Sequence, residues 1–417
     1  MEVKPGCKQT EVGVIPEDWD VKPLHALANI RSGLAKNSNT TVSDPIRVHY
    51  LRVANVQDGF LDLTDMSQIE VSRSDLNRFS VLPGDVLMNE GGDLDKLGRG
   101  SIWRGELQPC IHQNHVFVVR CGSFVSPEYL TIWSSGTKAR RYFLIAGKQT
   151  TNLASINKTS LGELPVVLPA QDEQRAIATA LSDMDALLDG LGRLIAKKRA
   201  IKQATMQQLL TGQTRLPGFS GEWEEKRLGD LADVRSGGTP STGDAGAWDG
   251  TIPWCTPTDI TSLEGRKYLT TTNRAITEHG LSTSSAELIP ARSIVMTSRA
   301  TIGECAINAV PVTTNQGFKN LVPHDSVDVE FLYYLLSTQT QGLIGLSAGS
   351  TFLEIGKTQL RQYEVKLPAK KDEQTAIATV LSDMDAEITA LETRRTKTRT
   401  LKQAMMQELL TGRTRLV

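Results

Sequence analysis

The sequence predicts a mixed α/β (α+β) protein in which two globular domains are separated by two long, antiparallel coiled-coil helices, related by a pseudo-two-fold internal repeat. Three observations support this prediction. The chain has 417 residues, which is too long for one typical core. Residues 172–216 recur at 372–416 with 28 of 45 positions identical. Each recurring segment has helical periodicity and follows a stretch of short apolar runs broken by turn residues.

The composition, 39% hydrophobic and 22% charged, is ordinary for a soluble globular protein. No run approaches the ~18 consecutive apolar residues of a membrane span. Residues 1–10 are polar and lack the apolar core of a signal peptide. The cysteines are odd in number and form no Cys-x-x-Cys motif, which indicates free thiols in a reducing cytoplasm. They are Cys7, Cys110, Cys121, Cys255 and Cys305.

The two globular domains are expected at residues 1–168 and 213–368. Each contains strand-type runs, namely Val116–Val119 and Pro165–Leu168 in the first, and Ile294–Met296 and Tyr363–Leu367 in the second. Their openings also correspond, although more faintly than the recurring segments. Trp19 and Arg31-Ser32-Gly33 match Trp223 and Arg235-Ser236-Gly237. Each half of the chain is therefore expected to be a variable, mixed α/β globular unit followed by a nearly invariant segment.

The two long helices are expected within residues 169–212 and 369–417. Apolar residues recur at alternating steps of four and three, which is the pattern of a coiled-coil seam. They are Ile177, Leu181, Met184, Leu188, Leu191 and Ile195, with Ile377, Leu381, Met384, Ile388 and Leu391 in the other copy. Farther along, we expect the seam to continue through Ile201, Leu209 and Leu210 and through Leu401, Leu409 and Leu410. Gly212 and Gly412 stand where a glycine ends a helix.

Charge is graded along both helices. The first half of each is acidic, as at Asp183, Asp185 and Asp189, and the second half is basic, as at Lys198 and Lys202. This gradient suits the helix dipole and also suits antiparallel pairing, in which an acidic half faces a basic half. Solvated helix faces are the alternative.

In each repeat, one part is nearly identical and the other diverges. Ordinary drift after a tandem duplication would spread the differences evenly. The observed pattern indicates a shared structural role for the helices and a different target for each globular domain.

Three polar, glycine-bearing loops occur in each globular domain. They are Asn89–Gly100, His112–His115 and Lys148–Asn157 in the first, and Thr297–Gly303, Thr313–Gly317 and Gly349–Ile355 in the second. Reading DNA requires Arg or Lys for guanine edges, Asn or Gln for adenine, and small hydroxyls for phosphate. The candidate DNA-binding residues on these loops are Lys96, Arg99, Gln149, Asn152, Arg299, Thr301, Ser350 and Thr351. Simple solvation of polar loops is the alternative.

Motifs for catalysis, cofactors and metals are absent or incomplete. Ile355-Gly356-Lys357-Thr358 resembles the end of a P-loop, but the first glycine of that motif would fall at Thr351. Glu364-Val365-Lys366 lacks the acidic partner that a nuclease needs. Cys110, His112, His115 and Cys121 are types that bind zinc, but the matching stretch of the second repeat has no ligand. We therefore predict no catalytic, cofactor-binding or metal-binding residues.

These residues together resemble the specificity (S) subunits of type I restriction–modification enzymes, the HsdS family. The resemblance covers the whole chain. Its most specific parts are the duplicated helices, with Asp-Glu-Gln near their starts (Asp172–Gln174, Asp372–Gln374) and Leu-Leu-Thr-Gly at their ends (Leu209–Gly212, Leu409–Gly412). Ala300–Gly303 and Gly349–Thr351 also look like the family's motifs, whereas the first domain departs from both at Lys96–Gly100 and Gln149–Asn152.

The resemblance implies a non-catalytic subunit that binds double-stranded DNA. Each globular domain would be a target-recognition domain that reads one half of a two-part site, and the helices would space the two halves. Two methyltransferase subunits, which bind S-adenosylmethionine, would dock on the helical regions, and restriction subunits, which use ATP and Mg²⁺, would supply DNA translocation and cleavage. Partners that share the phosphate contacts would also account for the net charge of −1, which is low for a protein that binds DNA alone.

Two rival hypotheses remain at this point. One is an antiparallel coiled-coil scaffold that binds protein ligands, and the other is a stand-alone modification enzyme. Salt-dependent, sequence-specific DNA binding would exclude the scaffold, and methyl transfer by the chain alone would support the enzyme.

Overall fold

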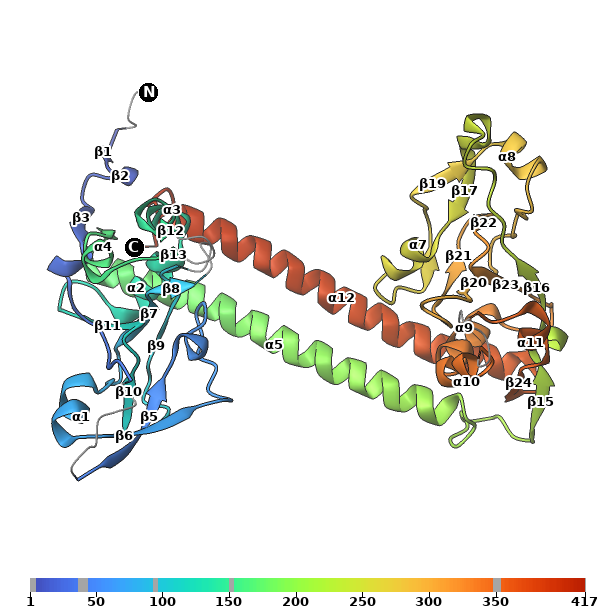
Figure 1. Ribbon diagram of the computed structural model, residues 1–417, viewed down its shortest axis with the longest axis horizontal. Coiled ribbons are helices and arrows are strands. Elements are labelled where there is room, and N and C mark those ends of the chain that lie inside the picture. The colour runs from blue at the N-terminus through green and yellow to red at the C-terminus, as the bar shows by residue number, and fades with distance from the viewer. Residues whose placement is uncertain (1–4, 37–43, 93–96, 150–153, 348–353, 417) are drawn as a thin grey trace. The chain divides into compact units, whose positions relative to one another are not determined.

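The computed structural model describes residues 5–36, 44–92, 97–149, 154–347 and 354–416. The chain divides into two compact units (Figure 1). The first comprises residues 1–192 and 393–417, and the second comprises residues 193–392. Each unit therefore contains one globular part together with the beginning of one long helix and the end of the other.

The two long helices are α5, Gln171–Leu209, and α12, Lys371–Leu409, each of 39 residues. They are the long green and red helices of Figure 1. Acidic residues occupy the first turn of both, where they complement the helix dipole. Both helices are followed by a glycine of positive φ, 71° at Gly212 and 69° at Gly412, as the sequence predicted. None of the helices in the described parts of the chain is both apolar and long enough to cross a membrane.

Most of the apolar residues predicted for the seam are buried or half-buried, but two are not. Ile177, Leu181 and Ile195 are buried. Ile201 and Leu401, however, are 42% and 54% exposed, so the prediction that they continue the seam is wrong. The half-buried residues beside them are Lys202 and Lys402, whose ammonium groups form ion pairs with the other long helix. Polar pairing has replaced apolar packing at this level of the helices.

Within each unit, ion pairs join α5 to α12 in an antiparallel sense. In the second unit, Lys198 pairs with Glu387 at 2.7 Å and Lys202 pairs with Asp385. In the first unit, Lys402 pairs with Asp185. Residue numbers increase along one helix as they decrease along the other, as antiparallel pairing requires. The Lys402–Asp185 and Lys202–Asp385 pairs occupy the same positions of the repeat, 200 residues apart.

The first unit contains short strands and helices around a four-stranded antiparallel sheet of order β4-β11-β7-β9. The strands are β1 (Cys7–Thr10), β2 (Gly13–Pro16), β3 (Asp20–Pro23), β4 (Ala28–Arg31), β5 (Ile46–Leu51), β6 (Ser67–Val71), β7 (Val86–Asn89), β8 (Gly91–Gly92), β9 (Gly100–Ile102), β10 (Cys110–His112), β11 (Val116–Cys121), β12 (Lys148–Gln149), β13 (Ala154–Ser155) and β14 (Pro165–Leu168). The helices are η1 (Leu24–Ala26), η2 (Val53–Asn55), α1 (Arg73–Phe79), α2 (Pro127–Ser135), α3 (Thr137–Ala146) and α4 (Lys158–Gly162).

The second unit contains a five-stranded sheet of order β16-β23-β20-β21-β18. The strands are β15 (Trp223–Arg227), β16 (Ala232–Ser236), β17 (Trp248–Cys255), β18 (Tyr268–Leu269), β19 (Arg274–Ile276), β20 (Ile294–Thr297), β21 (Cys305–Asn308), β22 (Thr313–Thr314), β23 (Phe318–Pro323) and β24 (Glu364–Pro368). The helices are α6 (Leu228–Leu231), η4 (Ala245–Ala247), α7 (Pro257–Thr261), α8 (Glu278–Ser282), α9 (Val329–Ser337), α10 (Thr340–Gly345) and α11 (Lys357–Gln362).

The two units repeat one topology. The order β4-β11-β7-β9 corresponds to β16-β23-β20-β21, and β10-β5-β6 corresponds to β22-β17-β19, with a parallel pair followed by an antiparallel pair in both. The antiparallel pairs β3–β14 and β15–β24 lead into the two long helices. The internal repeat inferred from the helices therefore extends to the globular parts, whose sequences match only faintly.

The main core of each unit combines its sheet and short helices with both long helices. The first core includes Ile177 and Leu181 from the start of α5 and Leu409 from the end of α12. The second core includes Leu381 from α12 and Leu209 from the end of α5. The recurring apolar residues at the helix ends thus belong to globular cores.

The contacts of the Asp-Glu-Gln motif at the start of α5 explain why this motif recurs in the second repeat. Glu173 is fully buried and accepts a hydrogen bond from the Trp19 indole at 3.0 Å. The Arg415 guanidinium donates to both of its oxygens, one at 2.7 Å, and also to Asp18 at 2.9 and 3.1 Å. These hydrogen bonds raise the pKa of Arg415 and lower the pKa of Asp18.

The second unit has the same arrangement. Glu373 is 4% exposed and accepts from Arg215 at 2.6 Å and from the Trp223 indole at 3.4 Å. We call these two groups, Glu173–Trp19–Arg415 and Glu373–Trp223–Arg215, the tail clasps. In each, the start of one long helix binds the segment that follows the other long helix.

The neighbouring glutamines connect the same helix starts to the globular parts. The side-chain oxygen of Gln174 accepts from the Ser126 amide at 3.0 Å, and that of Gln374 accepts from the Asp328 amide at 2.9 Å. Ser126 and Asp328 are the N-cap residues of the corresponding helices α2 and α9. Each recurring glutamine therefore fixes the helix that packs beside it.

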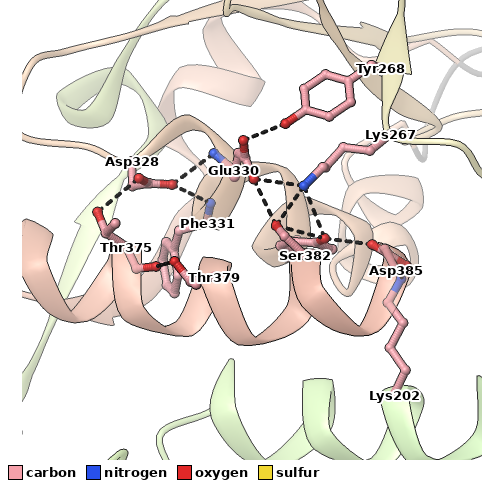
Figure 2. A network of polar contacts seen from close by, with 11 residues as sticks. Lys202, Lys267, Tyr268, Asp328, Glu330, Phe331, Thr375, Thr379, Ser382 and Asp385 are labelled. Atoms are coloured by element: carbon pink, nitrogen blue, oxygen red, sulfur yellow. Dashed lines mark hydrogen bonds and ion pairs between the residues drawn. The ribbon is translucent and has the colours of Figure 1, made fainter. Parts of the chain in front are cut away.

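A further polar network in the second unit joins the globular part to α12 (Figure 2). The Lys267 ammonium lies 2.7 Å from both the Glu330 carboxylate and the Ser382 hydroxyl. Burial alone would raise the pKa of Glu330, but hydrogen bonds from Lys267, Tyr268 and Ser382 lower it to about 2. The network holds α9 against the first turns of α12.

Candidate nucleic-acid interface

The three loops predicted from the second repeat meet at one end of β20. The Ser298 amide donates to the Gly317 carbonyl at 2.7 Å, and the Ile355 amide donates to the Ser298 carbonyl at 3.0 Å. Residues of all three loops are therefore joined directly by backbone hydrogen bonds, although they lie far apart in sequence.

The three loops of the first repeat meet in the same way. The Glu90 amide donates to the His115 carbonyl at 2.9 Å, and the Ile156 amide donates to the Glu90 carbonyl at 2.8 Å. Glu90 thus corresponds to Ser298, His115 to Gly317 and Ile156 to Ile355. We call this pair of backbone hydrogen bonds, in either unit, the loop frame.

The Arg-Ser-Gly motifs pack against the middle loop of the frame. A Cβ on Gly33 would lie 2.1 Å from the His112 carbonyl oxygen, and one on Gly237 would lie 1.9 Å from the Asn315 carbonyl oxygen. Real Cβ atoms do not approach an oxygen so closely, so only glycine fits at these positions. The glycines of this motif are structural, which explains why both repeats have them.

The second unit places a cluster of charged side chains beside its loop frame. Arg299 lies 2.8 Å from one oxygen of Glu354, and Lys319 lies 3.3 Å from the other. The Lys319 side chain is only 7% exposed, whereas 46% of the Arg299 side chain is exposed. Burial raises the pKa of Glu354, but the hydrogen bond from Arg299 and the charge of Lys319 outweigh burial and lower it. We call Arg299, Glu354 and Lys319 the charged triad.

The first unit has a different set at the corresponding positions. Gly91 pairs with Ser155 in β8 and β13, where Arg299 and Glu354 form a β-bridge in the second unit. His115 and Glu90 instead form an ion pair or hydrogen bond of 2.7 Å.

The predicted DNA-binding candidates differ in where they lie and in how far the structure describes them. Arg299, Thr301 and Arg99 lie on the loops that meet at the frames, as expected. Thr301 accepts hydrogen bonds from Thr297 and from the Glu304 amide, so its backbone shapes the turn. Arg99 is half-buried beside β9, and its Nε is buried without a hydrogen-bond partner.

The other candidates are described in part or not at all. Gln149 has its backbone in β12, which pairs with β13 beside the frame of the first unit. Lys96, Asn152, Ser350 and Thr351 lie outside the residues that the structure describes.

Lys319 and Glu354 were not predicted from the sequence. Lys319 is the one charged residue of the strand Phe318–Pro323, and a buried lysine is an unusual residue. That single charge within a strand-type run was the signal available. Glu354 fell inside a named loop, but its partners are distant in sequence.

The described residues contain no group of three or more His, Cys, Asp or Glu side chains placed to hold a metal. His112, one of the zinc-ligand types considered, is fully buried and its Nδ1–H donates to the Val116 carbonyl at 2.6 Å. Burial lowers the pKa of His112 to about 4. The five cysteines are free thiols.

Comparisons with known proteins agree with this architecture. The model of the type I restriction modification DNA specificity domain matches residues 220–399. The MjaIX specificity subunit of Methanocaldococcus jannaschii is 43% identical over 39% of this chain and 38% of its own length. The putative MjaX specificity subunit of the same organism is 25% identical over 98% of this chain and 96% of its own length.

The chain is thus similar to type I restriction–modification specificity subunits, through the domain match at residues 220–399 and through a relative matched along nearly its whole length. A solved S subunit of a type I restriction–modification system from M. genitalium has the same fold, with a TM-score of 0.58 and 14% identity over 98% of both chains. The resemblance drawn from the sequence is thereby confirmed. The curated relatives are named specificity subunits, which are the non-catalytic members of such systems, and this supports the prediction that the chain is not an enzyme.

Proposed function

We propose that this specificity subunit reads a two-part DNA site and that each unit reads one half of it. With the boundaries predicted from the sequence, residues 1–168 and 213–368 are the two target-recognition domains, and residues 169–212 and 369–417 are the helical regions that space them. The loop frames are the proposed DNA-reading positions, and Arg99, Arg299 and Thr301 are the described candidates there.

One observation carries this proposal. The two loop frames preserve the same backbone hydrogen bonds, while the polar side chains beside them differ, with Glu90 and His115 in one and the charged triad in the other. A shared backbone with different side chains is what two readers of different half-sites require, because base edges are recognised by side-chain chemistry.

When two recognition domains are joined by long helices, the discrimination factors of the two half-sites multiply. Once one unit has bound its half-site, the second contact becomes intramolecular and has a high effective concentration. The distance between half-sites then becomes a recognised feature in addition to their sequences.

The partners are proposed from the family. Two methyltransferase subunits would dock on the helical regions and supply S-adenosylmethionine, and restriction subunits would supply ATP- and Mg²⁺-dependent activity. These partners would share the phosphate contacts, which suits a chain of net charge −1. With five free thiols, the chain suits the reducing cytoplasm that we propose as its location.

The test is the methylation pattern of genomic DNA at single-base resolution, in source cells with and without this gene. We expect one two-part methylated-adenine motif to disappear with the gene and to return on complementation. Unchanged methylation while the methyltransferase subunits are expressed and active would contradict the proposal and favour the scaffold that binds protein ligands.

A further inference from the structure

We propose that Glu354 is a positioning residue for Arg299: anchored by Lys319, its carboxylate holds the Arg299 guanidinium in one orientation, in which Arg299 reads a single guanine of the second half-site. This inference rests on the proposed function and adds which base type one residue reads and what orients it.

The backbone that carries Arg299 is fixed on both sides. The preceding residue, Ser298, is bonded through its amide and its carbonyl to the other two loops of the frame. Arg299 itself forms a β-bridge with Glu354. The following residue, Ala300, adopts a positive φ of 55°, and the Gly303 amide closes the turn on the Thr297 carbonyl at 3.0 Å. The Cα of Arg299 therefore has little freedom.

The two oxygens of Glu354 have separate partners. One lies 3.3 Å from Lys319 and the other 2.8 Å from Arg299. Lys319 lies within β23, and its ammonium also lies 3.5 Å from the Ser298 hydroxyl. A lysine that is almost fully buried needs a counter-charge, so its interaction with Glu354 is costly to break. Lys319 thus fixes the carboxylate, and the carboxylate fixes the guanidinium.

The orientation of a guanidinium matters for reading a base. Arginine presents five N–H donors in a rigid plane, and guanine presents two acceptors, O6 and N7, in the major groove. One Nη atom of Arg299 is bound to Glu354, so donors remain for a base edge on the exposed part of the side chain. Holding the plane beforehand lowers the rotamer entropy that is lost on binding.

The triad also suits a negatively charged ligand. Two cations and one carboxylate leave it with a net positive charge, so Glu354 orients Arg299 without making the position repel phosphate. In the first unit, the residues at the corresponding positions are Gly91 and Ser155. The triad is therefore particular to the second unit, and its loss should affect only one half-site.

A contact to a phosphate is the other role open to Arg299. The two roles predict different results, because a phosphate contact weakens binding to all sequences alike and makes it less dependent on salt, whereas a base contact changes preference at one position.

The experiment uses the full chain in complex with its methyltransferase subunits and selects bound DNA from a library randomised around the motif. The wild-type complex must first enrich a two-part motif, and if it enriches none, the proposed function itself fails. Arg299→Lys keeps the charge but removes the planar fork, and Glu354→Gln keeps the shape but removes the charge. Arg292→Lys is the matched control, because Arg292 is an exposed arginine beside the opposite end of β20.

We expect Arg299→Lys and Glu354→Gln to reduce the preference for guanine about 5- to 150-fold at one and the same position of one half-site. The other half-site, and the whole motif of Arg292→Lys, should be unchanged. Retention of the first half-site also reports that the variant complex is folded. Because Glu354→Gln leaves the buried Lys319 unpaired, the double variant Glu354→Gln/Lys319→Met provides a version without that charge.

Uniform weakening across all sequences, with a smaller salt dependence, would assign Arg299 to a phosphate and overturn the inference. An unchanged motif in Arg299→Lys would overturn it as well. If Arg299→Lys changes one position and neither Glu354 variant does, Arg299 reads a base without being positioned by Glu354.

Discussion

Replacing Arg415 by Met removes the cation that neutralises Glu173 in the tail clasp of the first unit. The Glu173 side chain is only 1% exposed and would lose both of its charge-assisted hydrogen bonds from the guanidinium, keeping only that from Trp19. A buried carboxylate without a counter-charge is strongly destabilising, so Arg415→Met should destabilise the first unit although Arg415 lies near the end of the chain.

The magnitude follows from the burial of the two partners. Breaking a fully buried ion pair by removing one partner costs about 3–5 kcal/mol. The Arg415 side chain is 34% exposed, so water reaches part of the site, and we expect about 2–3 kcal/mol for the first unit. For a unit of about 200 residues, this corresponds to a decrease in melting temperature of about 4–12 °C.

The measurement is scanning calorimetry of the purified full chain, because the two units can unfold in separate transitions. The matched control is Arg413→Met, two residues earlier on the same tail. Arg413 is 55% exposed and lies 3.4 Å from Glu408, so its loss should cost less than about 1 kcal/mol. Equal, small shifts for Arg415→Met and Arg413→Met would refute the reasoning, because the clasp would then contribute no more than a surface ion pair.

Four further predictions concern the core, the loops and the helices. Because burial lowers the pKa of His112 to about 4, below the unfolded value of ~6.5, the urea midpoint should decrease as pH falls from 6.5 to 4, and less so in His112→Gln. Gly237→Ala should destabilise the second unit by about 1–3 kcal/mol or more in urea unfolding, whereas Gly243→Ala, with no atom closer than 3.9 Å to the new Cβ, should change little. A double-mutant cycle on Lys202 and Asp385 should give a favourable coupling free energy that decreases in 1 M salt, because both side chains are at least one-fifth exposed. A coupling free energy of zero at low salt would contradict the antiparallel ion pairing. Deletion of one helical turn from α5 alone should alter or abolish recognition of the motif in the library selection, and unchanged selection would contradict the spacing role of the helices.

The helices were predictable because their information is local. A repeat of 28 identities in 45 positions, an apolar seam and a terminal glycine all lie within one continuous segment. The errors at Ile201 and Leu401 have the same origin. An apolar residue in a helix was assigned to the seam, but the half-buried Lys202 and Lys402 occupy that face and find acidic partners on the other helix.

The tail clasps and the charged triad were not predictable, because their partners are far apart in sequence. Glu173 and Arg415 are separated by 242 residues, and both belong to motifs whose recurrence was visible but whose pairing was not. A repeat shows that two copies share contacts, but it does not show whether a motif contacts its own copy or the other one. The strand topology of the repeat, in contrast, followed from the duplication once one unit was known.

The near-zero net charge of the chain is not evidence against DNA binding, because several of its carboxylates are used inside the structure. Glu173 and Glu373 neutralise the arginines of the tail clasps, and Glu330 neutralises Lys267 in the second unit. Such carboxylates lower the net charge, yet their fields are cancelled locally by the partner cation. DNA phosphates would interact with the net charge at the loop frames, and the charged triad of the second unit has a net positive charge. The salt dependence of DNA binding measures that local charge directly, and composition does not.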